Sequence, residues 1–506
     1  MTLCSSRSST LKRRWPLYIA LGTLLSWLLQ AFLFSRAGRF KSVACMGLFG
    51  AYLLLLLLLR VRKVPLKEYA VPLILAAGFL MQLAFIIRMP YDFSWHDLGG
   101  FGALEDTQIY GGHMGYINYL VKFGRLPMEN PLVKAYEDFY HPPLYHLIQA
   151  GFLKINLLAG IPLEAALEHL QITTMFFSSL SLWLAWQILE ELGCSYRGVR
   201  AGVLFAAFQP MFIIYAGTLN NDITSLFFLL LTVLYTLRWL KEPTLRRVIF
   251  IALALGLGMA AKFSVVVMAL PLGLVFAVRL FQNLREWKTY VPQYLLFLLI
   301  SVPVGIAWQL FHAIRFGMPL SFVRLPAESV NVGHLPLAAR YGIPDGAALR
   351  SLFYTGIRKL DYNIWFQTLK TALFDEMTLF PTGSPMWYLS YLLTSLFALL
   401  AATAAALFAH VSVKRDPVSP PLGRLFLAVF AVSLLGSYLL FSLQYPYICS
   451  FNFRYIFPVV VLAATAFAKF CQKPAWPVKL VEAFIWVFSG LSCVVYGVYL
   501  FTQVSP

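Results

Sequence analysis

Apolar runs of about 20 residues recur along almost the whole chain, and this recurrence limits most strongly how the chain can fold. As a helix, each run is long enough to cross a hydrocarbon core of about 30 Å. The runs are 15–35, 42–59, 70–88, 170–190, 201–217, 223–240, 247–261, 263–278, 290–310, 386–409, 424–442, 455–470 and 480–501. They predict an all-α polytopic membrane protein with about 13 transmembrane helices.

The composition supports this class of protein. Only 12% of the 506 residues are charged and 60% are hydrophobic, whereas a soluble domain carries about 25% charged residues. This excludes an ordinary soluble enzyme, a disordered chain and a fibrous protein. The net charge of +18 would suggest a nucleic-acid partner in a soluble protein. Here the basic residues lie in short segments between apolar runs, so we expect a lipid bilayer and no nucleic acid as partner.

The basic segments predict the orientation in the membrane. They occur at 7–14, 60–67, 238–247, 279–288, 414–424 and 469–479, and all lie on one side if the N-terminus is cytoplasmic and the C-terminus is outside. The first run resembles a signal peptide, but residues 34–37 form a poor cleavage site, so it is expected to stay as an anchor. We expect a multi-pass protein of the bacterial cell membrane.

Two long loops, about 89–169 and 311–385, then fall on the outer side. They divide the chain into two N-terminal helices (1–69), a helical core with the first loop (70–310), the second loop (311–385) and C-terminal helices (386–506). The apolar stretch 141–160 opens with His-Pro-Pro-Leu-Tyr. If it crossed the membrane, every later basic segment would lie outside, so it is predicted to be an interfacial helix with the prolines in its first turn. Residues 107–124 have a similar character.

The first loop holds the candidate catalytic acids. Asp97 follows the third helix by nine residues, and Gly99 and Gly100 would let backbone and substrate approach it closely. Partial desolvation there would raise the pKa of a carboxylate and suit it to act as a general base. Asp106 is the second candidate for this role. The alternatives are a solvated loop or, if the segment is helical, a metal site from Asp92, His96 and Asp97.

Other polar residues are predicted to line a substrate cavity with Asp92 and His96. They are Glu105, His113, His141 and Asp222. For His113 a structural pairing is the alternative, and Asn221 or Asp222 could instead cap the following helix. Asp375 and Glu376, near the end of the second loop, are interpreted as structural.

Two cations stand at the outer ends of apolar runs without an evident acid partner in sequence. Lys262 lies between the runs 247–261 and 263–278, and Arg454 is the only basic residue of its outer loop. Interfacial anchoring explains either residue. The alternative is that they bind a lipid phosphate, to which a guanidinium is well suited.

Several segments follow one another along the chain: the acid-bearing first loop, HPPLY at 141–145, NND at 220–222, GLGMAAKFS at 256–264 and FRYIFP at 453–458. In the order of these segments, the chain resembles the GT-C superfamily of membrane glycosyltransferases. Within this superfamily, the chain most resembles the protein O-mannosyltransferases and the aminoarabinose transferases that modify lipid A. The resemblance implies a polyprenyl-phosphate-linked sugar donor, an inverting transfer without metal or cofactor, and a first-loop Asp as base. Two helices precede the family's first, and the mannosyltransferases' adjacent Asp-Glu pair is absent, with only the reversed Glu105-Asp106 and the isolated Asp97.

The expected function is therefore transfer of a hexose or pentose to an acceptor hydroxyl on the outer face of the membrane. The donor phosphate would meet Lys262, Arg454 and Tyr455, and the acceptor would be a glycan, glycolipid or protein. The alternative is a secondary transporter or a lipid-linked-substrate flippase. Transporters usually place ionisable residues near the midplane, often in inverted repeats, whereas the acids here gather in one loop.

Overall fold

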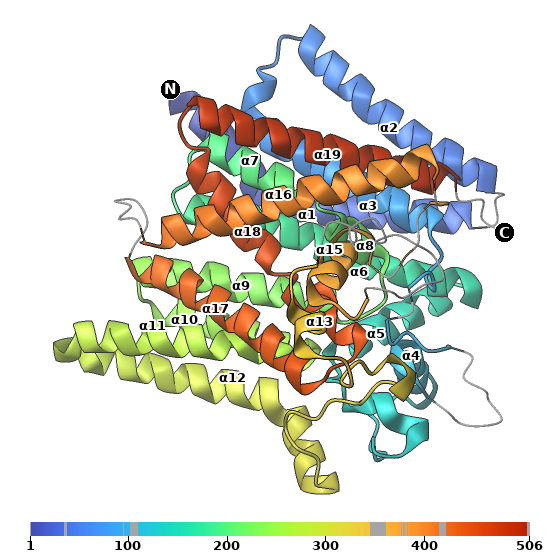
Figure 1. The fold of residues 1–506 in the computed structure, drawn as a ribbon, viewed down its shortest axis with the longest axis vertical. Coiled ribbons are helices and arrows are strands. Elements are labelled where there is room, and N and C mark those ends of the chain that lie inside the picture. Colours follow the sequence, from blue (N-terminus) through green and yellow to red (C-terminus); the bar gives the residue numbers. More distant parts are fainter. Residues whose placement is uncertain are drawn as a thin grey trace.

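The structure is a computed structural model (Figure 1). It describes residues 2–34, 38–94, 96–101, 110–344, 361–375, 377, 380–381, 383–413 and 421–502.

Long apolar helices make up most of the molecule and run across the view in Figure 1. Within these ranges, ten helices are long and apolar enough to cross a membrane, or up to twelve if each of two bent pairs is one span. The unbroken long helices are α1 (Thr2–Leu33), α2 (Gly38–Val61), α3 (Ala70–Arg88), α6 (Leu163–Glu191), α9 (Asp222–Lys241), α11 (Ala269–Gln282, preceded by η3 Phe263–Met268), α12 (Trp287–Phe316), α16 (Pro385–Val413), α17 (Pro421–Gln444) and α19 (Trp476–Thr502). The chain is therefore an integral membrane protein.

Two predicted spans are bent, and one is short. The run 201–217 forms α7 (Tyr196–Ala207) and α8 (Pro210–Gly217), bent by 49°, and the turns η6 (Ile448–Phe451) and η7 (Phe453–Ile456) meet α18 (Val459–Phe470) at 44°. The run 247–261 forms α10 (Leu245–Ala261), which has only 17 residues and packs against α9 and α12. The all-α polytopic fold is confirmed, but the predicted count of 13 is not.

Small residues allow two of the central helices to approach closely. Gly198 and Gly202 of α7 lie against α18, where a Cβ on Gly198 would come within 2.1 Å of the Ala468 carbonyl oxygen and one on Gly202 within 2.6 Å of the Ala464 carbonyl oxygen. A four-residue spacing of small residues is typical of close helix packing in membranes, where van der Waals contact replaces the hydrophobic effect. This contact joins the C-terminal helices to the core.

Several short helices lie toward one end of the long ones, with α4 and α5 on the right side of Figure 1 and α13 and α15 nearer its middle. They are α4 (Gly112–Phe123), α5 (Leu144–Leu158), α13 (Leu337–Tyr341) and α15 (Ile364–Phe374), and we call this end the loop face. With 15 residues, α5 is about 22 Å long, which is too short to span. It begins after Pro143 rather than including the two prolines in its first turn, and α6 begins at Leu163, so the first loop is shorter than predicted.

Candidate active site in the central cavity

A cavity of about 550 Å³ opens among α9, η3, α12, α17, η7 and the first long loop. We call it the central cavity. Its lining includes many of the predicted site residues and several polar residues that were not predicted: Asp97, His113, Tyr140, His141, Asn221, Asp222, Lys262, Gln309, His312, Tyr438, Arg454 and Tyr455. Side chains from positions 97 to 455 are thus brought to one place.

The two cations of the cavity have acid partners that were not evident in the sequence. Lys262 Nζ pairs with Asp222 Oδ1, and Arg454 Nη2 lies 3.5 Å from Asp97 Oδ2. Both cations also approach the ring of Tyr455, at 5.5 Å for Lys262 Nζ and 5.0 Å for the Arg454 guanidinium carbon. The sequence concealed the two ion pairs because their partners are separated by 40 and 357 positions.

Lys262 occupies a break between helices. The α10 helix ends at Ala261, Lys262 is extended (φ −152°, ψ 120°), and η3 begins at Phe263. The terminal carbonyl of Ala261 accepts a hydrogen bond from Asn221 Nδ2 at 3.2 Å, which satisfies one of the carbonyls left free at a helix end. Asn221 stands at the N-cap position of α9 but its side chain makes no capping bond, so it holds the helix break instead.

Asp97 faces the cavity from a constrained loop. Its backbone is left-handed (φ 51°), a conformation that Asp tolerates better than most residues. Its carbonyl accepts a hydrogen bond from His113 N–H at 2.8 Å. Its side chain is 53% exposed because it borders the cavity rather than a packed core.

The electrostatic setting of Asp97 differs from the expectation. Burial raises the pKa of its carboxyl, but Arg454, His141, His96 and Lys262 together lower it further, so the net pKa lies below the usual value. The predicted raised pKa is therefore wrong for Asp97. The largest cause of the lowering is the positive charge of Arg454.

A cluster of histidines lines the cavity beside Asp97. His113 Nδ1 lies 2.9 Å from His146 Nε2, and the His113 and His141 rings are 5.1 Å apart between centroids. Burial lowers the pKa of His141 to about 4 although Asp97 acts in the opposite direction, and it lowers the pKa of His113 well below its usual value. These imidazoles are neutral at pH 7, so each ring has one donor and one acceptor nitrogen.

Several buried polar atoms of the cavity lining have no hydrogen-bond partner among the described residues. They are His141 Nε2, Asp222 Oδ2, Gln309 Oε1, His312 Nε2 and Arg454 Nε. Buried polar atoms without partners are costly and rare in native proteins. Water molecules or a polar ligand in the central cavity would supply partners for these five atoms.

Gln309 and His312 were missed in the sequence analysis. They lie three residues apart near the loop-face end of α12, an otherwise apolar helix. Polar residues at this spacing project from the same side of a helix, and within a membrane span they usually face a cavity. This pattern could have identified them.

Other predicted site residues lie elsewhere. Asp92 borders a separate cavity of about 450 Å³ with Lys41 and Glu168, and His96 is buried against Asp375. Among the described residues, no three His, Cys, Asp or Glu side chains are grouped to hold a metal ion. The segment around Asp92 forms turns rather than the helix that the metal hypothesis assumed. Glu105 and Asp106 lie outside the described residues.

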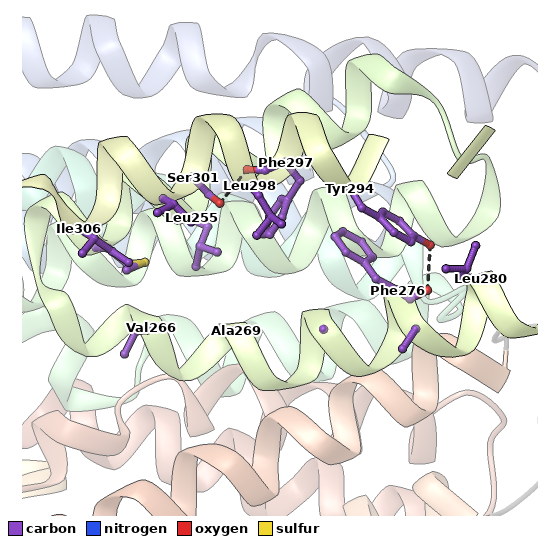
Figure 2. Close-up of a pocket in the computed structure, with 14 residues that line it drawn as sticks. Leu255, Val266, Ala269, Phe276, Leu280, Tyr294, Phe297, Leu298, Ser301 and Ile306 are labelled. Carbon is purple, nitrogen blue, oxygen red and sulfur yellow. Dashed lines mark hydrogen bonds between the residues drawn. The ribbon is translucent and has the colours of Figure 1, made fainter. Parts of the chain in front are cut away.

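An apolar pocket of about 470 Å³ adjoins the central cavity (Figure 2). It lies between α10, α11 and α12, with Leu255, Phe276 and Phe297 among its lining residues. Its few polar groups are satisfied: Tyr294 donates to the Phe276 carbonyl and Ser301 to the Phe297 carbonyl, both at 2.8 Å. Val266 lines both spaces, so a polar chamber and an apolar one meet at this residue.

Comparison with known proteins supports the resemblance inferred from sequence. Residues 140–308 match a family model described as dolichyl-phosphate-mannose-protein mannosyltransferase. This segment contains His141, Asp222 and Lys262, whereas Asp97 and Arg454 lie outside it. The comparison with curated proteins gave no significant match.

Two solved structures illustrate the similarity. ArnT from Cupriavidus metallidurans, bound to undecaprenyl phosphate, has 13% sequence identity and a TM-score of 0.45, with 81% of this chain covered. The oligosaccharyltransferase AglB from Archaeoglobus fulgidus, bound to an inhibitory peptide and a dolichol-phosphate, has 16% identity and a TM-score of 0.47, with 87% covered. This chain spans 62% and 57% of their lengths. The match to the family model, over residues 140–308, confirms the predicted resemblance to the mannosyltransferase family for that segment.

Proposed function

We propose that the chain is a membrane glycosyltransferase that moves a sugar from a polyprenyl-phosphate-linked donor to an acceptor hydroxyl. The observation that carries the proposal is the set of unpartnered polar atoms around the central cavity, together with two cations, two carboxylates and an adjoining apolar pocket. A sugar phosphate would supply the missing hydrogen-bond partners. Its lipid would leave the cavity beside Val266 and lie in the apolar pocket.

The proposed reaction assigns separate tasks to the charged groups. Asp97 takes the proton from the acceptor hydroxyl, whose oxygen forms a bond to the anomeric carbon of the sugar. The bond from that carbon to the phosphate oxygen breaks on the opposite face, which inverts the anomeric centre. Arg454 and Lys262 stabilise the charge that develops on the leaving phosphate, and Tyr455 holds both cations beside it. No metal ion has a part in this scheme.

The low pKa of Asp97 is compatible with a general base that is activated by substrate. At neutral pH the carboxylate is ionised, so it can accept a proton. When the donor phosphate binds Arg454, its negative charge offsets the cation that lowers the pKa of Asp97. The pKa should then rise, which strengthens the base only when donor is present.

The orientation follows from the same scheme. We propose that the loop face is the outer face, because the basic segments of the sequence predict cytoplasmic short loops. The acceptor is a glycan, a glycolipid or a protein, and it would reach Asp97 from this side. A transporter or flippase could use a similar cavity, but neither would break the bond between sugar and phosphate.

The test is to incubate the purified protein in lipid nanodiscs with labelled polyprenyl-phosphate sugars and membrane acceptors. Release of polyprenyl phosphate with label transfer is expected for the wild type. Asp97→Asn should lower the turnover by about 10²–10⁴-fold without weakening donor binding. Glu164→Gln, an exposed acid at the start of α6, is the matched control and should stay active. Movement of intact donor between leaflets without bond cleavage would support the flippase alternative instead.

A further inference from the structure

A buried carboxylate of the second long loop contacts the first loop directly beside Asp97. Asp375 follows α15, and its two oxygens lie 2.6 and 2.5 Å from His96 Nε2. Both residues are buried, at 5% exposed for His96 and 1% for Asp375. Asp375 does not line the central cavity, so its link to Asp97 on this side passes through His96.

The same carboxylate also contacts the segment that carries Arg454. Asn452 Nδ2 donates to Asp375 Oδ1 at 3.3 Å, and Asn452 Oδ1 accepts a hydrogen bond from the backbone N–H of Arg454 at 2.9 Å. Arg454 Nη2 then returns to Asp97 Oδ2 at 3.5 Å. The contacts form a closed ring in which Asp375 is linked to the candidate base on one side and to the candidate phosphate-binding cation on the other.

Backbone conformation marks the same two positions. The non-glycine residues with positive φ in the described part of the chain are Lys63, Asp97 and Asp375. Lys63 lies in the exposed turn after α2, whereas Asp97 (φ 51°) and Asp375 (φ 52°) flank the His96 contact. Unfavourable backbone conformations persist where surrounding contacts fix them, and they cluster at functional sites.

We infer that Asp375 is a positioning residue, which holds Asp97 and Arg454 at a fixed separation across the central cavity through His96 and Asn452. The inference rests on the proposed function. Its physical basis is that base and leaving-group cation lie on loops distant in sequence, and a displacement of about 1 Å can cost about 10²-fold in rate. If the buried pair of His96 and Asp375 served only to pack the two loops together, it would not need to lie beside both Asp97 and Arg454.

The test compares turnover and stability in a double-mutant cycle. Asp375→Gly removes the carboxylate but tolerates the positive φ. It should lower kcat by about 10²-fold with little change in the KM for donor, since no donor contact is lost. Asp375→Asn keeps an acceptor and also tolerates this backbone, so it should recover most of the lost kcat.

The second arm of the cycle separates positioning from folding. His96→Ala leaves Asp375 without its histidine partner, which should lower the unfolding temperature, because a buried unpaired carboxylate is costly. His96→Ala combined with Asp375→Gly removes both groups and should regain stability. If Asp375 acts through His96, kcat in the double variant stays as low as in the single variants, because the position of Asp97 is still not fixed.

The outcomes are decisive in either direction. Full kcat in a folded Asp375→Gly variant, or recovery of kcat together with stability in the double variant, would overturn the inference. If these variants do not fold, His96→Asn replaces them, because its shorter polar side chain does not reach Asp375 from the position of the imidazole Nε2; a lowered kcat at unchanged KM supports the inference, and a normal kcat overturns it. Absence of sugar transfer by the wild type would instead refute the proposed function.

Discussion

At the scale of single residues, the central cavity contains two acids and two cations that form two ion pairs. Asp97 pairs with Arg454, and Asp222 pairs with Lys262. A phosphate entering the cavity would compete with the two carboxylates for the two cations. The affinity for donor should therefore depend on the acids as well as on the cations.

Replacement of Arg454 should weaken donor binding. A charge-assisted contact contributes about 1.5–3 kcal/mol, so Arg454→Ala is expected to raise the dissociation constant for a polyprenyl phosphate by about 10- to 150-fold. Equilibrium binding of labelled lipid in nanodiscs would measure this. Arg315→Ala, at an exposed position near the end of α12, is the control for loss of one positive charge. Equal affinities in the two variants would exclude Arg454 as a phosphate-binding residue.

The pH dependence should report the effect of the donor on Asp97. Activity requires the ionised carboxylate, so it is lost as the pH falls through the pKa of Asp97. That pKa is lowered in the free protein, with Arg454 the largest cause acting in this direction. The pH profile of kcat/KM reports the pKa of Asp97 in the free enzyme, and the profile of kcat reports its pKa in the complex with donor. Because bound phosphate should raise this pKa, the acidic limb of kcat should lie at higher pH than the acidic limb of kcat/KM. Coincident acidic limbs would contradict activation of Asp97 by the bound phosphate.

At the scale of structural elements, the backbone just after Asp97 crosses the backbone at the start of α4. The two segments are too close to leave space for side chains at the crossing. Gly99 (φ 63°) and Gly112 (φ 73°) face each other, and a Cβ on Gly99 would lie 1.9 Å from the Gly111 carbonyl oxygen. The backbone of Met114 also bonds to the Leu98 carbonyl at 2.8 Å. The start of α4 thus fixes the loop that presents Asp97.

The two adjacent glycines of this loop should differ sharply in their tolerance of substitution. Gly99→Ala requires both a strained φ and movement of backbone atoms, and is expected to destabilise the protein by about 1–3 kcal/mol or more and to lower turnover. A Cβ on Gly100 would meet no atom within 4 Å, so Gly100→Ala should stay within about 0.5 kcal/mol of the wild type. Thermal unfolding in detergent, with turnover measured in parallel, would compare the two variants. Similar behaviour would show that the crossing does not support the site.

At the scale of the whole molecule, the two ends of the chain lie at opposite ends of the long helices (Figure 1). The loop face carries α4, α5, α13 and α15, and the cavity residues Asp97 and His141 lie in the segments just before α4 and α5. If basic short loops are cytoplasmic, this face is outside and donor and acceptor meet there.

Cysteine labelling from outside would test the orientation. Leu132 and Ile343 are 57% and 87% exposed and belong to the two long loops, so Leu132→Cys and Ile343→Cys should react with a reagent that does not cross membranes. Arg285→Cys, in the predicted cytoplasmic segment after α11, should stay protected until the membrane is opened. All three are made in a Cys449→Ser background, because Cys449 is partly exposed. Protection of either loop position, or labelling of position 285, would overturn the orientation.

The sequence by itself determined the class of the molecule and many of the residues in its cavity. Apolar runs of spanning length predicted the helices, because backbone polar groups in lipid have no water to bind. A single run satisfies their hydrogen bonds internally by forming a helix. Lys262, Asp222, His141, Arg454 and Asp97 were recognisable as charged or polar residues at the ends of apolar segments, where they are costly without a function.

Only the tertiary structure decided how these residues pair. Three contacts join positions that no local sequence pattern connects, since each depends on how separate helices pack. They are Arg454 with Asp97, Lys262 with Asp222 and His96 with Asp375. The direction of the Asp97 pKa shift followed from these pairs and reversed the prediction from burial alone. The exclusion of Asp92 from the cavity likewise depended on turns in the first loop, because periodicity has no meaning where the chain is not helical.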